Sequence, residues 1–262
     1  MRDQDGPGGR AASKDHAASA DAQLIIAESR WPMATAVTLA VVLQICKPDW
    51  MLLGPKWIAP TVWSVLLIAL ILSDPGRIDD RSRRLRILTI SLVILVAAEA
   101  LGSTVLLILE LLQGGPHTGS ATSLLAAGGI VWADNIIACS LLYWALDSGG
   151  SAARAQRVSQ YPDLAFPQML TPGLAPPGWR PRYIDYLYLG FTATTALSPA
   201  DVMPLARWAK LLMMIQALVS LTIMVLVVGR AVNVLIEDRT RNSRGTGRSR
   251  EVAASPRSRF PR

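Results

Sequence analysis

The chain has 262 residues, of which 51% are hydrophobic and 17% are charged. Soluble domains are usually about a quarter charged, so this composition excludes an ordinary soluble globular domain and indicates a protein that lies in lipid. The net charge is +7, but the basic residues gather in the two tails and in one short connection. This distribution does not form a folded basic face, so no nucleic-acid partner is expected.

Six apolar segments follow one another between two polar tails. A helix needs about 20 apolar residues to span the hydrocarbon core, so these segments predict an all-α polytopic membrane protein with five to six transmembrane segments. The fifth segment is short, and its length leaves open whether it crosses the membrane or is re-entrant. The expected segments are 31–46, 57–73, 87–112, 122–146, 183–199 and 208–236.

Composition divides the chain into five regions. Residues 1–30 are small and polar and are expected to form a disordered cytoplasmic tail. Residues 31–146 are expected to form a four-helix transmembrane bundle, and 147–182 a proline-rich surface loop. Residues 183–236 are expected to form a short helix followed by a long transmembrane helix. The arginine-rich stretch 237–262 is expected to be a second disordered cytoplasmic tail that binds anionic lipid headgroups.

The connection 147–182 contains several prolines, which prevent one continuous helix. Its apolar side chains are expected to lie on the headgroup region of the membrane, and a partner-binding loop is the alternative interpretation. These apolar residues are Leu164, Phe166, Met169 and Leu170.

Arginine placement predicts how the segments are oriented. The connection 73–86 holds five arginines, whereas 113–123 holds no lysine or arginine. The positive-inside rule therefore places the first in the cytoplasm and the second outside. With the arginine-rich C-terminus also in the cytoplasm, the number of crossings must be even. The segment 183–199 is then expected to cross the membrane, which leaves both termini in the cytoplasm.

Two acidic residues lie near the centres of apolar segments. Glu99 is central in 87–112 and Asp134 is central in 122–146, and the short connection between these segments predicts an antiparallel pair. An ionised carboxylate at that depth costs about 3 kcal/mol, so both side chains should face the bundle interior. They either share a proton or bind a cation, or they hold helices together by hydrogen bonds. The partners expected for such bonds are Asn135, Ser103, Thr104 and Gln216.

The stretch from residue 183 to 232 carries the most specific pattern in the chain. Aromatic residues precede Thr194 and Thr195, Asp201 and Pro204 form a D-x-x-P sequence, and a long uncharged segment follows. This order resembles the pore helix, filter and inner helix of the potassium-channel superfamily. Where that family has Gly-Tyr-Gly, this chain has Leu-Ser-Pro-Ala at 197–200. Without glycine the filter is degenerate, and potassium selectivity is not expected.

The resemblance implies a role for several residues. The hydroxyl groups of Thr194, Thr195 and Ser198 would line the narrow part of a pore, and Asp201 would attract cations at its mouth. Pores of this superfamily close by symmetry, so a homo-oligomer is implied.

A wider resemblance covers residues 57 to 236. The chain is similar there to small polytopic bacterial membrane proteins without an assigned activity, which implies a multi-pass protein of the bacterial cytoplasmic (inner) membrane. The strings that carry it, in order, are SDPGRIDDRSRRLR, YWALDSGG, FPQM, DYLYLGFT, SPADVMPLARWAK and RAVNVL.

Enzymatic function is not expected, because the chain lacks G-x-S-x-G, H-E-x-x-H, P-loop and clustered-cysteine sequences. No catalytic residue, metal site or cofactor is therefore predicted. Two hypotheses remain: a membrane protein with a channel-like C-terminal part that permeates or senses ions, or a non-conducting membrane scaffold that binds lipid or a partner.

Overall fold

The computed structural model is mostly helical and describes most of the chain between residues 31 and 254. The predicted N-terminal tail 1–30 lies outside the described residues, as do Ser198 and the end of the C-terminal tail. The described ranges are 31–73, 83–150, 153–154, 161–171, 173–176, 179–195 and 201–254.

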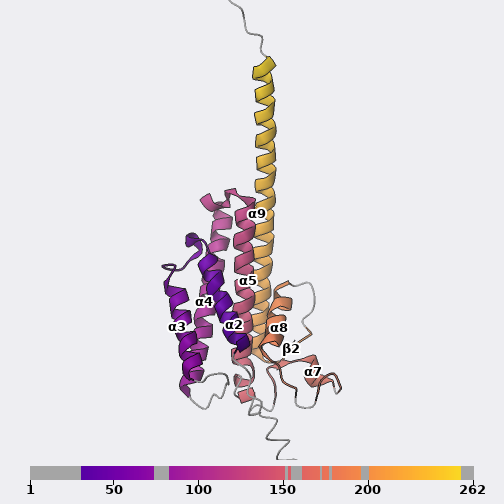
Figure 1. Cartoon of the computed structure of the whole chain (residues 1–262). Coiled ribbons are helices and arrows are strands. Elements are labelled where there is room, and N and C mark those ends of the chain that lie inside the picture. Colours follow the sequence, from indigo (N-terminus) through magenta and orange to yellow (C-terminus); the bar gives the residue numbers. More distant parts are fainter. Residues whose placement is uncertain are drawn as a thin grey trace, which may run out of the picture.

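Among the described residues, three helices are long and apolar enough to cross a membrane. They are α4 (Arg83–Gln113), α5 (Ala121–Leu146) and α9 (Arg207–Ala254). Helix α5 packs against both of the others, and 67% of its apolar span is buried, against 22% for α9. Figure 1 shows α5 in the centre of the bundle. Helix α5 is therefore the scaffold on which the other elements are positioned.

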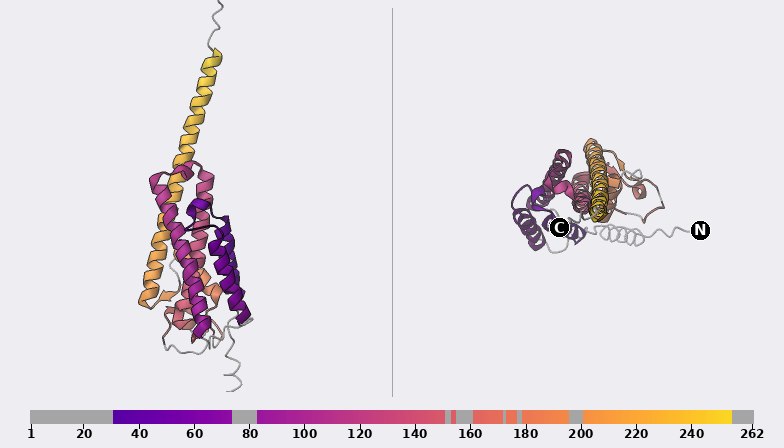
Figure 2. Two further views of the ribbon diagram at one scale, coloured as in Figure 1. Left: turned by 90° about the vertical axis from the view of Figure 1, so that its left-hand side faces the viewer. Right: turned by 90° about the horizontal axis from the view of Figure 1, so that it is seen from above.

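Two shorter apolar helices, α2 (Trp31–Cys46) and α3 (Ile58–Ser73), form an antiparallel pair beside α4 and α5 (Figures 1 and 2). Each has 16 residues and is therefore about 24 Å long, less than the hydrocarbon thickness of about 30 Å. Pro48 ends α2, because the residue before a proline is disfavoured in helical geometry. The next residues form the short 3-10 helix η1 (Asp49–Met51), which packs on α4.

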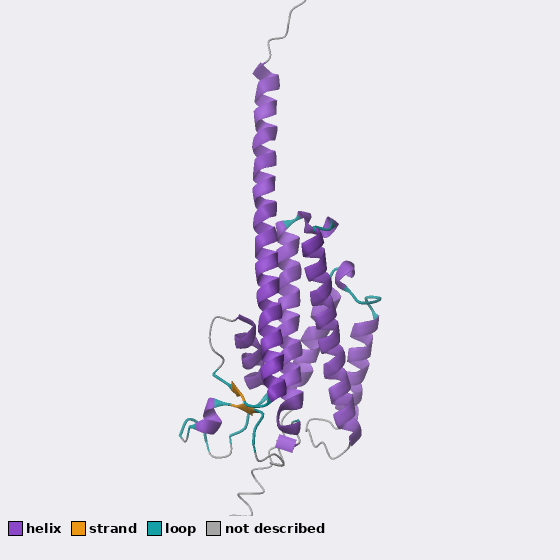
Figure 3. Ribbon diagram, turned by 180° about the vertical axis from the view of Figure 1, so that it is seen from behind, coloured by secondary structure: helices purple, strands orange, loops and turns teal. Residues whose placement is uncertain are grey.

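Helix α8 (Tyr183–Thr195) has 13 residues, and the chain segments before and after it lie at the same end of the bundle. Strand β1 (Leu164–Ala165), which precedes α8, pairs antiparallel with β2 (Met203–Pro204), which follows it. Figure 3 shows this pair at the base of α9. The chain therefore turns back between α8 and β2, whereas the arginine distribution predicted that the segment 183–199 leads to the opposite end of the bundle.

The connection between α5 and α8 is less superficial than predicted. It contains η3 (Asp147–Gly149), β1 and the short helix α7 (Pro167–Leu170). Leu164 and Phe166 are buried in the core, whereas Met169 and Leu170 are exposed. The surface-loop prediction is thus wrong for Leu164 and Phe166, because β1 and the residue after it pack beneath α8.

Helix α9 continues well beyond its apolar part. The predicted disordered tail from residue 237 is wrong as far as Ala254, where the 48-residue helix ends. A helix of this length extends for about 70 Å. Figure 1 shows its C-terminal part projecting beyond the other helices.

Candidate functional site

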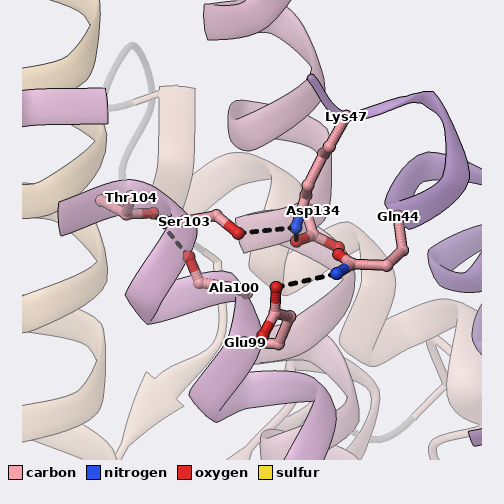
Figure 4. Close-up of polar contacts among 7 residues, drawn as sticks. All are labelled: Gln44, Lys47, Glu99, Ala100, Ser103, Thr104 and Asp134. Carbon is pink, nitrogen blue, oxygen red and sulfur yellow. Dashed lines mark hydrogen bonds and ion pairs between the residues drawn. The ribbon is translucent and has the colours of Figure 1, made fainter. Parts of the chain in front are cut away.

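A buried ion pair lies in the middle of the bundle. Lys47 follows the last residue of α2, and its Nζ donates to Asp134 Oδ2 on α5 at 2.7 Å and to Ser103 Oγ on α4 at 2.9 Å (Figure 4). The side chains of Lys47 and Asp134 are 0% and 1% exposed. The carbonyl end of α2 favours a cation at this position. Lys47 was not predicted as a site residue, although a lysine between an apolar segment and a proline is a visible signal.

Glu99 belongs to the same cluster. Gln44 on α2 donates from Nε2 to Glu99 Oε1 at 2.7 Å, and Gln44 is buried. Figure 4 shows the Gln44 side chain reaching from α2 toward the two acidic residues. The helices therefore bring Glu99 and Asp134 into one region, and α2 supplies a bonding partner to each. We call Gln44, Lys47, Glu99, Ser103 and Asp134 the midplane cluster.

The four residues that were expected to bond to the two acids have other hydrogen-bond partners. Of the four expected partners, Ser103 joins the midplane cluster through Lys47. Thr104 donates to the Ala100 carbonyl of its own helix, and Asn135 donates to Ser220 on α9. Gln216 belongs to a separate network. The two acids are thus bonded to residues at the end of α2, and the sequence had not predicted a contact between them and this helix.

Gln216 on α9 forms the second buried polar network, which holds α8. Its Nε2 donates to the Gly190 carbonyl at 2.9 Å and to Thr194 Oγ1 at 2.7 Å. Its Oε1 accepts from the Tyr143 hydroxyl on α5 at 2.6 Å. All the amide's polar groups are satisfied in this way, and three helices are joined. Gly190 lies directly on Ser140 of α5, where any larger side chain would collide.

The predicted pore residues have different environments. Thr194 is 2% exposed and bonded to Gln216, so its hydroxyl is inside the packed protomer and does not line an open surface. Thr195 is half-buried at the end of α8, and Asp201 is exposed. In the structure Thr194 therefore fastens α8 to α9 through Gln216, whereas the sequence predicted that its hydroxyl lines a pore.

Asp147, at the end of α5, fixes the entry to α8. Its carboxylate is buried and accepts from the Tyr186 hydroxyl at 2.6 Å and from the Leu164 backbone amide at 3.3 Å. Asp163 holds the chain that follows α8, since its carbonyl accepts from the backbone amides of Leu205 and Ala206. Neither aspartate was predicted as important. Their positions beside the short strands explain why the chain turns back here.

Comparisons with protein-family models, with curated proteins and with solved structures found no match for this chain. The resemblances described above therefore rest on the residues that carry them.

Proposed function

We propose that the chain is a multi-pass protein of the bacterial cytoplasmic membrane and that its C-terminal part permeates or senses ions. In this arrangement α4, α5 and α9 cross the bilayer, α2 and α3 enter it as a short pair, and α8 is re-entrant. The apolar side chains exposed along α9 support the first part, because a bilayer is the solvent in which they are stable.

The ion-permeation proposal rests on the return of the chain after α8 to the end of the bundle at which α8 begins, which is the course of a re-entrant helix. Non-helical backbone at membrane depth is stable only where protein buries it or where it lines a wet cavity. The β1–β2 pair, together with Asp147 and Asp163, returns the chain to the end at which α8 began. Thr195 would then lie at the narrow part of the pathway, with Asp201 at its entrance.

A pore of this kind requires several copies of the chain. The exposed face of α9 supports a homo-oligomer, because apolar side chains recur along it at alternating spacings of three and four residues, the spacing of helices that pack in parallel. These residues are Leu211, Met214, Leu218, Leu221, Val225 and Val228. The absence of glycine at 197–200 is the reason that we propose a pathway without potassium selectivity.

Flux through proteoliposomes tests this proposal. The purified chain is expected to support cation uptake that Asp201→Asn reduces and that Thr195→Trp blocks, because the first removes the charge at the entrance and the second fills the pathway. Val65→Trp is the matched control, since Val65 is exposed on α3, which packs on α2 and α4, and the same indole there should leave uptake unchanged. A folded, stable oligomer without flux would refute the proposal.

A second candidate function is a non-conducting scaffold, which the length of α9 favours. Residues 237–254 continue the helix away from the bundle and carry five arginines. Basic side chains close to an anionic surface each contribute about 1 kcal/mol of attraction. Removal of residues 237–262 would then abolish binding to vesicles that contain anionic lipid, while a permeation function would tolerate the truncation.

A further inference from the structure

The midplane cluster contains one more acidic group than basic groups. Glu99 and Asp134 supply two carboxyl groups, and Lys47 supplies one ammonium group. The helices packed around them add no compensating charge: α2, α3 and α9 between 211 and 229 contain no charged residue. If all three groups were ionised, the cluster would carry a net charge of −1 in surroundings of low dielectric constant. An uncompensated charge there is strongly unfavourable.

Two acceptor atoms in the cluster also lack a donor. Asp134 Oδ1 and Gln44 Oε1 are buried and have no hydrogen-bond partner among the residues that the structure describes. Buried polar atoms are almost always paired, so each such atom requires an explanation. Both are oxygen acceptors on residues that are at least 98% buried, and Figure 4 shows both side chains converging on the same region. These two acceptors can be satisfied by a hydrogen-bond donor or by a cation.

We propose that the midplane cluster binds one exchangeable proton, carried by the carboxyl group of Glu99 or Asp134. A single proton cancels the surplus negative charge and at the same time supplies an O–H donor for an unpaired acceptor. A metal ion would cancel the charge as well, but it would lie beside the Lys47 ammonium, which already occupies Asp134 Oδ2 and Ser103 Oγ. Two adjacent positive centres repel each other strongly in a poorly screened interior, and this repulsion favours the proton.

Glu99 is the group through which the proton exchanges. Asp134 is 1% exposed and enclosed by α2, α4 and α5, whereas Glu99 is only partly buried. Gln44 binds Glu99 and is separated from Lys47 by two residues, so the end of α2 contacts both acids. The site uses none of the residues assigned to the pore, and it stands whether or not α8 belongs to a conducting pathway.

Carbodiimide labelling of the purified full-length chain in detergent tests the proposal. Dicyclohexylcarbodiimide adds to a protonated carboxyl group in apolar surroundings, takes up its proton and leaves a stable N-acylurea. We expect up to one label per chain, located by fragment mass spectrometry on Glu99 or Asp134, and a labelling rate that falls as the pH is raised. Labelling confined to other residues, or labelling of neither acid in the folded protein, would overturn the proposal.

Two controls separate the proton from other ligands. Glu99→Gln should reduce labelling of the cluster at least tenfold, whereas Glu110→Gln, on the same helix but bonded to His117, should leave it unchanged. Protection by sodium chloride but not by choline chloride, at equal pH and ionic strength, would show that a metal ion is the ligand and would overturn the proton assignment.

Infrared spectroscopy of the wild-type chain gives an answer that needs no variant. A protonated carboxyl group should show a C=O stretching band that shifts in D2O and declines as the pH is raised. If Glu99→Gln does not fold, the wild-type spectrum and the wild-type labelling map decide the proposal together. A spectrum without such a band at any pH at which the protein remains folded would contradict it.

Discussion

The side chains of Lys47 and Asp134 form an ion pair in the interior of the bundle, with 2.7 Å between Nζ and Oδ2, although 87 residues separate them in the chain. The pair joins the end of α2 to the centre of α5. It exists because Pro48 ends the helix at a depth where the long lysine side chain reaches an acid that has no closer partner of opposite charge among the described residues.

This geometry predicts a strong coupling between the two residues. Lys47→Met or Asp134→Leu alone should lower the free energy of unfolding by about 3 to 5 kcal/mol, because each leaves a buried charge without its partner. The double variant should be more stable than the sum of the single effects implies. Denaturation in sodium dodecyl sulfate, followed by circular dichroism, measures all three. Lys56→Met is the control, since Lys56 and Asp49 are exposed and 3.7 Å apart. Strict additivity of the two buried substitutions would contradict the coupling.

Two adjacent glycines on α5 should respond differently to alanine. A Cβ atom at Gly128 would lie 2.9 Å from the Val227 methyl groups on α9, whereas one at Gly129 would meet no atom within 4 Å. We expect Gly128→Ala to destabilise the α5–α9 contact by about 1 to 3 kcal/mol. Gly129→Ala should be neutral or stabilise the helix by up to about 1 kcal/mol. Thermal melting of the two variants in detergent makes the comparison, and equal melting temperatures would show that the helices do not pack as described.

The hydroxyl of Tyr186 should stabilise the packing of α8 against the end of α5. Tyr186→Phe removes the donor to the buried Asp147 carboxylate and is expected to cost about 1 to 3 kcal/mol of stability. Tyr188→Phe is the matched control on the same helix, because Tyr188 is 54% exposed and Tyr186 is 0% exposed. The measurement is the melting temperature of each variant. A loss of stability in the Tyr188 variant that equals the loss in the Tyr186 variant would argue against the Asp147 contact.

The proposed re-entrant course of α8 predicts which parts of the chain share a side of the membrane. In a background with Cys46 and Cys139 replaced by alanine, single cysteines at Tyr161, His117 and Ser249 can be tested with an impermeant thiol reagent on intact cells. Positions 117 and 249 should share one side and position 161 should lie on the other, because α5 and α9 are proposed to cross once each. If positions 161 and 249 were labelled from the same side, the segment 183–199 would cross, as the arginine distribution suggested.

The sequence alone determined where the helices lie. Long uncharged runs such as 211–229 have no stable alternative to a helix in lipid, and their ends are marked by polar residues or by proline, as at Pro48. Glu99 and Asp134 could be identified as interior residues for the same reason, since a carboxylate facing lipid is too unfavourable. These features depend on local composition, which a single sequence contains.

Tertiary structure alone decided which residues meet. The pairing of Lys47 with Asp134 and the contacts of Gln216 with Thr194 and Gly190 depend on which helix faces are apposed. The course of α8 depends on two short strands whose pairing leaves no periodic signal in the sequence. Counting arginines predicted a crossing, because that rule weighs the sums of charges in connections and contains no information on the bonds of Asp147 and Asp163. Those bonds join residues that are far apart in the sequence and close in space. They return the chain to the end of the bundle at which α8 began.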